Sequence, residues 1–361
     1  MSPFLDLPPL SAARFAAIED KVAALLHTGA DVIVTQGEAL LPLEAAIRSA
    51  VHPGSTALNI VTGPYGQTFG NWLRDCGAKV VDLAVPFDTA ATAEQVADAL
   101  RAEPGIDFVS LVHAEAATGN TNPVAEIAAV VREHGALLML DAVASVAAEP
   151  LLTDAWGVDL CVIGGQKAMG GPAGVSAVSV SARAWERITA NPAAPRRSYL
   201  SLLDWKDRWT DAGRRTLPHA PAQLEMLALD ACLDRIADHG LDATIARHRA
   251  ACAATRAGVR ALGTLAPFVT EDRHAAPVAT TLRTPPGLDA TELAARLDPA
   301  LPVQAGGGAL AAELLRVNHY GRAASLDTVQ NVLAALAHAL PTADPLHVRT
   351  TAAHAWADSI G

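Results

Sequence analysis

The alternation of strand-like and helix-like segments over the first half of the chain is the feature that most restricts its fold. Short apolar runs predict buried strands, and longer stretches with apolar residues at helical spacing predict the helices between them. Strands that alternate with helices form a doubly wound, mostly parallel sheet. We expect strands at residues 32–34, 57–61, 79–83, 108–113, 137–141, 160–163 and 175–180, and helices at 11–26, 41–51, 67–76, 93–101, 124–134 and 182–189.

The second half of the chain breaks this pattern. Residues 192–215 combine prolines, arginines and two tryptophans, which predicts an irregular excursion at an interface. One long helical stretch is expected from Pro221 to about Leu262, because Gly263 is a natural helix stop.

The C-terminal third has the pattern of a smaller α+β domain. Strands are expected near residues 279–283 and 314–318, followed by a helix over 327–340 and an alanine-rich tail from Pro341 that can be helical. We therefore predict a large α/β domain over residues 1–235 and a small domain over residues 236–361.

Composition excludes several classes of function. The 361 residues are 51% hydrophobic and 18% charged, with a net charge of −11 and no basic run, so a sizeable core is expected and nucleic-acid binding is not. No apolar stretch is long enough to predict a membrane span, and no signal peptide is recognised. The four cysteines show no C-x-x-C spacing and the histidines no H-E-x-x-H, so neither a metal site nor disulfides are predicted, and a reducing cytoplasm is expected.

A lysine and a carboxylate follow two successive strands of the predicted sheet. The run 137–141 ends on Asp141, and the run 160–163 leads through glycines to Lys167. Ligands bind at the carboxyl edge of parallel sheets, and the glycines let a ligand approach the backbone closely. A lysine able to form a Schiff base, with an acid able to face a pyridine nitrogen, is the minimum set for pyridoxal chemistry. We predict that Lys167 and Asp141 are catalytic, rather than a solvated lysine and a helix-capping acid.

Other common motifs fail in their details. The glycines at 165 and 170 are followed by Gly171 rather than by Lys-Ser/Thr, so they do not form a P-loop, and no G-x-S-x-G elbow is present. Gly306-Gly307-Gly308 does not follow the strand-turn-helix pattern of a dinucleotide fingerprint. Hydrolase and nucleotide functions are therefore not indicated.

Four segments together resemble the class V aminotransferases of fold type I, the family of alanine–glyoxylate and serine–pyruvate aminotransferases. They are residues 113–119 (HAEAATG), 141–145 (DAVAS), 165–174 (GQKAMGGPAG) and 315–324 (LRVNHYGRAA). Segments 36–46, 63–72 and 191–205 are most similar to family members that use the unphosphorylated vitamin pyridoxamine, with pyruvate, as a substrate. The resemblance implies an aspartate-aminotransferase-like large domain that binds vitamin B6 on a mostly parallel seven-stranded sheet.

The resemblance also implies roles for single residues. Lys167 would form the Schiff base and move a proton between the substrate carbon and C4′ of the ring, and Asp141 would keep the pyridine nitrogen protonated. Val143 would pack on one face of the ring and Tyr65 would stack on the other. The alternatives for these two are a core valine and a core tyrosine with a satisfied hydroxyl group.

Glu38 distinguishes two kinds of enzyme within the family. Relatives that hold pyridoxal phosphate bind its phosphate with a loop rich in Gly, Ser and Thr before the first helix of the sheet domain, whereas this loop reads Gly37-Glu38-Ala39-Leu40. A carboxylate about 5 Å from a phosphate costs roughly 3 kcal/mol per unit charge at an effective dielectric of ~20. A helix-end acid, the alternative role, contributes only about 0.3–1 kcal/mol. Glu38 therefore predicts a neutral hydroxymethyl group, although Gln166, which can contact the phosphate in relatives, is retained.

Arg316 is the candidate that would bind the substrate carboxylate through a bidentate pair, with a structural salt bridge as its alternative. The pyridoxamine-using relatives carry a second arginine nine positions earlier, where this chain has Gly307. Either the acceptor is not pyruvate, or another group such as Arg322 compensates.

Three functions remain open from sequence alone. The first is an aminotransferase that moves the amino group of pyridoxamine to a 2-oxo acid, and the second is an ordinary aminotransferase with tightly bound pyridoxal phosphate. The third is a vitamin B6 binder without turnover. The resemblance implies small-molecule substrates and a homodimer or homotetramer, since oligomers of this fold build each site at a subunit interface.

Overall fold

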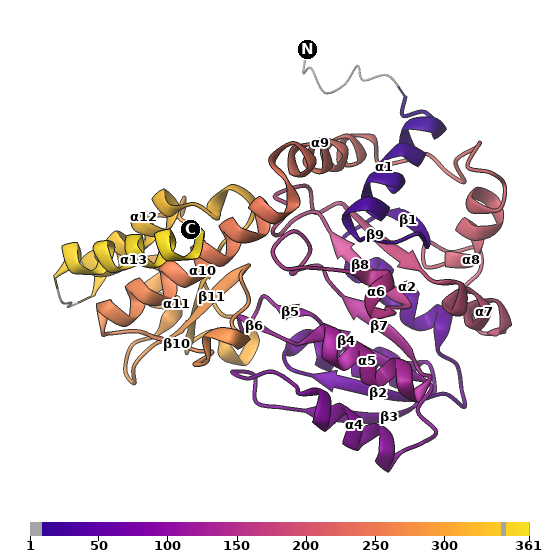
Figure 1. Ribbon diagram of the computed structural model, residues 1–361, viewed down its shortest axis with the longest axis horizontal. Coiled ribbons are helices and arrows are strands. Elements are labelled where there is room, and N and C mark those ends of the chain that lie inside the picture. Colours follow the sequence, from indigo (N-terminus) through magenta and orange to yellow (C-terminus); the bar gives the residue numbers. More distant parts are fainter. Residues whose placement is uncertain (1–8, 341–343, 361) are drawn as a thin grey trace.

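The computed structural model describes residues 9–340 and 344–360 as a large sheet domain and a smaller domain joined by long helices (Figure 1). The large domain holds a seven-stranded sheet in the order β1-β9-β8-β7-β4-β2-β3. Strands β8, β7, β4, β2 and β3 are parallel to one another, whereas β9 is antiparallel to both of its neighbours. The strands are β1 (Asp31–Gln36), β2 (Thr56–Val61), β3 (Lys79–Ala84), β4 (Phe108–Val112), β7 (Leu137–Asp141), β8 (Leu160–Gly164) and β9 (Val175–Val180).

The central strands are buried along their whole length. Every residue of β4, β7, β8 and β9 is buried, which requires cover on both faces of the sheet and explains why these strands read as continuous apolar runs. The cover comes from helices α1 (Ala12–Leu25), α2 (Leu40–Ala50), α3 (Pro64–Asp75), α4 (Ala93–Ala102), α5 (Val124–His134), α6 (Thr153–Trp156), α7 (Ala182–Ala190) and α9 (Gln223–His239). The predicted mostly parallel seven-stranded sheet is confirmed, and the predicted helices of this half lie within three residues of their expected starts.

The predicted single helix from Pro221 to Leu262 is wrong. Two helices, α9 and α10 (Leu241–Leu262), meet at Gly240. The φ of Gly240 is +83°, which lies outside the helical region and is a conformation that glycine adopts readily. Gly263 ends α10 in a left-handed conformation, as predicted. The predicted domain boundary after residue 235 falls inside α9, so the chain passes between the domains through this helix pair (Figure 1).

The small domain packs helices on an antiparallel sheet of order β10-β11-β13-β12. Its strands are β10 (Ala266–Pro267), β11 (Ala279–Arg283), β12 (Val303–Ala305) and β13 (Leu314–Asn318), and its helices are α10, α11 (Ala290–Ala295), α12 (Leu326–Ala339) and α13 (Pro345–Ile360). The tail predicted to be helical forms α13, which lies along α10 (Figure 1), although residues 341–343 of the tail fall outside the described residues. Within the described residues, no helix is long and apolar enough to span a membrane.

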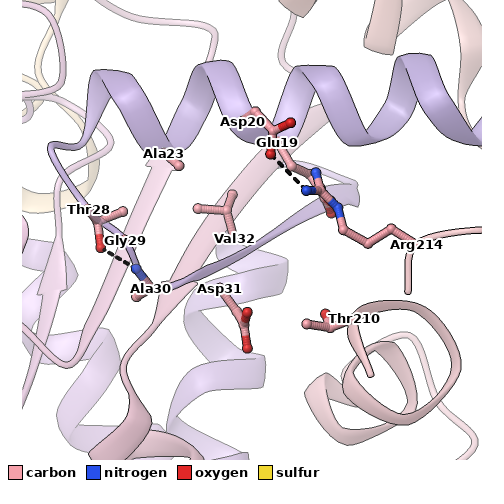
Figure 2. A pocket seen from close by; sticks show the side chains of 10 residues that line it. All are labelled: Glu19, Asp20, Ala23, Thr28, Gly29, Ala30, Asp31, Val32, Thr210 and Arg214. Carbon is pink, nitrogen blue, oxygen red and sulfur yellow. Dashed lines mark hydrogen bonds and ion pairs between the residues drawn. The ribbon is translucent and has the colours of Figure 1, made fainter. Parts of the chain in front are cut away.

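The excursion at residues 192–215 is anchored to the first helix of the chain. It contains α8 (Leu202–Trp205) and a π-helical turn at Lys206–Thr210. Trp209 donates to the buried Glu19 carboxylate at 2.9 Å, and Arg214 pairs with Glu19 at 3.0 Å and with Asp20 at 2.7 Å. Figure 2 shows Arg214 reaching from the excursion to α1. Both segments line a cavity of 230 Å³. These contacts fix an otherwise irregular segment against the sheet domain.

Candidate active site

Asp141 and Lys167 come from adjacent strands at one edge of the sheet. Strands β7 and β8 pair in parallel, with Asp141 opposite Val162, and Lys167 follows three residues after β8. Asp141 is buried, and one of its carboxylate oxygens accepts from the Val143 N–H at 2.9 Å. Burial raises the pKa of Asp141 to about 6, and the nearby Lys167 charge opposes this rise. A cationic ring nitrogen beside it would favour the charged carboxylate further.

Lys167 is held in surroundings that favour its neutral amine. Burial lowers the pKa of Lys167, while the carboxylates of Asp141 and Glu115 act against that change. Its Nζ lies 5.3 Å from the centroid of the Tyr65 ring. Tyr65 is half-buried in the first turn of α3, and burial, with the Asp141 and Glu38 charges, raises the pKa of its phenol. The structure therefore brings the predicted lysine, acid and aromatic ring together around one point.

Glu115 belongs to the same surroundings, although the sequence did not predict it there. It lies in the short strand β5 (Ala114–Glu115), which pairs with β6 (Asn120–Thr121), and its side chain is fully buried. One carboxylate oxygen accepts from Gly66 N–H at 3.3 Å, and the other has no hydrogen-bond partner among the described residues. Gly63 is required beside it, because a Cβ there would overlap the carboxylate. The only signal in the sequence was an acid inside an otherwise apolar and small-residue segment.

We predict that Glu115→Gln stabilises the protein at alkaline pH. Burial raises the pKa of Glu115 to about 8, so the folded state holds a proton that the unfolded state has released by pH 6. Between pH 6 and pH 8 the wild type should therefore lose about 2 kcal/mol of stability relative to the Gln variant, which imitates the protonated acid. Urea unfolding of both proteins at the two pH values measures this difference. The exposed Glu126→Gln variant is the control, and a pH-independent difference for Glu115→Gln would contradict the prediction.

Glu38 and Gln166 meet at the start of α2. Glu38 uses one carboxylate oxygen to accept from the Leu40 N–H and the other to accept from the Gln166 amide, both at 2.8 Å. The carboxylate thus occupies the N-terminal end of α2, where an anion would be favoured by the helix dipole. The charge of Glu38 also contributes to raising the pKa of Asp141. The oxygen of the Gln166 amide is buried and has no hydrogen-bond partner among the described residues.

Val143 follows Asp141 by two residues, donates its backbone N–H to that carboxylate, and is buried with 4% of its surface exposed. The side chains of Val143 and Gln166 both lie close to Gly164. A Cβ on Gly164 would collide with the Gln166 amide oxygen and lie 3.1 Å from the Val143 side chain. The absence of a side chain at Gly164 therefore allows Gln166 to fold back towards Glu38.

Arg316 reaches from the small domain to the large one. It lies in β13 and donates to the Ala116 carbonyl at 3.3 Å, and the Gln304 amide, with its oxygen turned to the guanidinium, accepts from Nε at 3.3 Å. No acidic side chain of the described residues forms an ion pair with it, so the salt-bridge alternative has no partner there. The Arg316 charge contributes to lowering the pKa of Lys167, which is consistent with its position beside the site. A Cβ on Gly307 would meet no atom of the described residues within 4 Å. Arg322 lines a cavity whose described lining includes neither Lys167 nor Arg316.

The fold and this constellation define a class of enzyme. A family model described as aminotransferase class-V matches residues 9–325, and the chain belongs to that family. It is therefore a transaminase of fold type I, and class V aminotransferases use pyridoxal phosphate. No group of three or more His, Cys, Asp or Glu side chains suited to a metal ion occurs among the described residues.

Two kinds of relative are similar over most of the chain. The pyridoxamine–pyruvate transaminase of Mesorhizobium japonicum is 35% identical, over 88% of this chain and 80% of its own length. The crystal structure of pyridoxamine-pyruvate aminotransferase from Mesorhizobium loti superposes with a TM-score of 0.91 at 32% identity, covering 95% of this chain and 88% of the other. An alanine–glyoxylate aminotransferase structure from Nostoc sp. gives a TM-score of 0.85 at 28% identity, covering 92% and 90%.

Proposed function

We propose that this transaminase transfers the amino group of free pyridoxamine to a 2-oxo acid, which yields pyridoxal and an amino acid. The observation that carries the proposal is the Glu38 carboxylate at the N-terminal end of α2, hydrogen-bonded to both Leu40 and Gln166. The name of the similar Mesorhizobium transaminase supports the same substrate pair.

The position of Glu38 argues against a phosphate at this point. The backbone N–H of Leu40 and the amide of Gln166 are donors that an anion could use, and Glu38 already engages both of them. A phosphate placed beside this carboxylate would meet a repulsion of roughly 3 kcal/mol per unit charge at a separation of about 5 Å. A hydroxymethyl group instead donates a hydrogen bond to the carboxylate without a charge penalty.

The other residues of the site have roles that follow from their surroundings. The vitamin, when bound, supplies a pyridine ring that accepts electrons and a carbon that forms a Schiff base, for which Lys167 is the candidate amine. Asp141 holds a proton on the ring nitrogen, Tyr65 and Val143 confine the ring, and Lys167 moves a proton to or from C4′. The lowered pKa of Lys167 supplies the neutral amine that these steps need.

Arg316 is proposed to bind the carboxylate of the 2-oxo acid. We expect Arg316→Gln to raise the KM for the 2-oxo acid by about 10–100-fold, because a charge-assisted hydrogen-bonded pair contributes roughly 1.5–3 kcal/mol. The KM for pyridoxamine should change much less. Steady-state kinetics with each substrate varied in turn measures both values.

Arg322→Gln is the matched control for this prediction and also tests compensation for the missing arginine at Gly307. An unchanged KM for the 2-oxo acid in Arg322→Gln assigns the carboxylate to Arg316 alone. Equal effects of the two variants would contradict that assignment.

The proposed function is tested with extensively dialysed enzyme and no added phosphate cofactor. Pyridoxamine and a panel of 2-oxo acids are mixed with the enzyme, and pyridoxal formation is followed by absorbance. Multiple turnovers establish the free vitamin as a substrate, and the best acceptor identifies the 2-oxo acid. Activity that requires pyridoxal phosphate and an amino acid would overturn the proposal.

The second candidate is an aminotransferase of the alanine–glyoxylate type with tightly bound pyridoxal phosphate. In this candidate Glu38 acts only as an acid at the end of a helix, a role that fits its hydrogen bond from the Leu40 N–H. The chain also has Gln166, the residue that can contact the phosphate in relatives. Copurified pyridoxal phosphate would support it.

We further propose a homodimer or homotetramer in a reducing cytoplasm, where the four cysteines, all free in the structure, stay as thiols.

A further inference from the structure

A small basic cavity lies next to the loop that carries Lys167, at the boundary between the two domains. Its volume is 190 Å³, and its walls come from Ala168 and Met169, from α9 and α10, and from Gly321 and Arg322. Among the described residues, no acidic side chain lines it and four basic ones do: Arg235, His239, Arg247 and Arg322. The chain as a whole has a net charge of −11, so this concentration of positive charge is local.

The guanidinium groups of this cavity are poorly compensated by the protein. Arg235 donates to the Met169 carbonyl, which is a neutral acceptor. Nε of Arg247 is buried and has no hydrogen-bond partner within residues 9–340 and 344–360. Burial and the Arg235 charge lower the pKa of Arg247, so the two guanidinium groups repel each other. Arg322 is exposed and pairs with no carboxylate of the described residues.

Such an arrangement is costly without an anion. A buried donor left without an acceptor costs about 1–3 kcal/mol, and like charges in a partly dehydrated cavity add to that cost. The planar donor fork of a guanidinium matches the oxygens of a phosphate or carboxylate. Three such forks around one cavity favour a ligand with at least two negative charges and several acceptor oxygens.

We propose that this cavity binds a phosphate group, as the free ion or as part of a small phosphate ester, held by Arg235, Arg247 and Arg322. A water molecule occupies about 30 Å³ in the liquid, so the cavity could hold a group with the volume of roughly six water molecules. That space suits a phosphate with a short substituent. Glu38, Asp141 and Lys167 are not among the residues that line this cavity. The proposal does not depend on the function proposed above.

Binding there connects the lysine loop to the small domain. Gly170 and Gly321 touch so closely that a Cβ on Gly170 would lie 2.8 Å from the Gly321 Cα, and the same Cβ would lie 3.3 Å from Arg235. A ligand shared by Arg235 of α9, Arg247 of α10 and Arg322 therefore ties α9 and α10 to the segment that follows β13, directly beside the loop after Lys167. The phosphate would act as a regulator or a structural anion, not as a reactant.

Isothermal titration of inorganic phosphate into enzyme kept in phosphate-free buffer tests this proposal. We expect one binding site per chain, whose Kd is unchanged when saturating pyridoxamine fills the active site. Arg322→Gln, which alters an exposed side chain, should raise the Kd by at least about tenfold, as should Arg247→Gln. Arg101→Gln, an equal loss of charge on the distant α4, should leave it unchanged.

Other outcomes overturn the proposal. They are no binding of phosphate, binding that pyridoxamine or a 2-oxo acid displaces, and binding that survives Arg322→Gln. Binding of a dicarboxylate such as succinate in place of phosphate also overturns it. The unfolding transition of Arg322→Gln shows whether this variant is folded. If it is, its Kd decides the test even when Arg247→Gln destabilises the chain.

Discussion

Lys167→Ala is expected to reduce the rate of pyridoxal formation from pyridoxamine by at least about 10³-fold. General acid–base catalysis by a positioned side chain contributes roughly 10²–10⁴-fold, and Lys167 is proposed to supply the Schiff-base amine as well. Its surroundings support both tasks, since burial lowers the pKa of its amine and Asp141 and Tyr65 lie beside it. Multiple-turnover assays on the wild type and the variant measure the loss.

A chemical readout separates this role from a structural one. Borohydride reduction in the presence of pyridoxal should attach the vitamin to Lys167 of the wild type, and mass spectrometry of peptides locates the label. The Lys79→Ala variant, which removes an exposed lysine of β3, should keep both the activity and the label. A Lys167→Ala protein that turns over at the wild-type rate would exclude both the free-vitamin and the phosphate-cofactor enzyme.

Much of this site could be predicted because its chemistry lies at the ends of two strands with strong patterns. The runs that became β7 and β8 are apolar throughout, so their ends, and with them Asp141 and Lys167, could be assigned to one sheet edge. Parallel pairing then brings the two residues together without further information. Helix α5 and strands β9, β11 and β13 were likewise found at their predicted bounds, because glycines, prolines or caps end each pattern.

The rest depends on contacts between distant parts of the chain. Glu115 could not be recognised as a buried acid because its neighbours are small, and its burial comes from α3 and Gly63, about fifty residues earlier. The break between α9 and α10 was missed because apolar spacing continues across Gly240, and only the positive φ of that residue shows the turn. Arg235, Arg247 and Arg322 show no pattern in sequence, since two helices and a loop of the small domain bring them together.

The Glu38→Gln variant should change which form of the vitamin the enzyme prefers. The substitution removes the negative charge but keeps a side chain that can accept from the Leu40 N–H and contact Gln166. We expect the ratio of kcat/KM for pyridoxamine phosphate to that for pyridoxamine to rise by roughly 10²-fold or more. Removal of a repulsion of about 3 kcal/mol per unit charge corresponds to a factor of this size.

Glu44→Gln is the matched control, because it removes an equal charge within α2, the helix that Glu38 precedes, at a side chain paired with Arg48. Both ratios are measured on dialysed protein with one 2-oxo acid in common. An unchanged ratio in Glu38→Gln would mean that no phosphate approaches this carboxylate in either protein. A wild type that already prefers the phosphorylated form would assign Glu38 to the end of α2 alone, and the enzyme would then be an aminotransferase with bound pyridoxal phosphate.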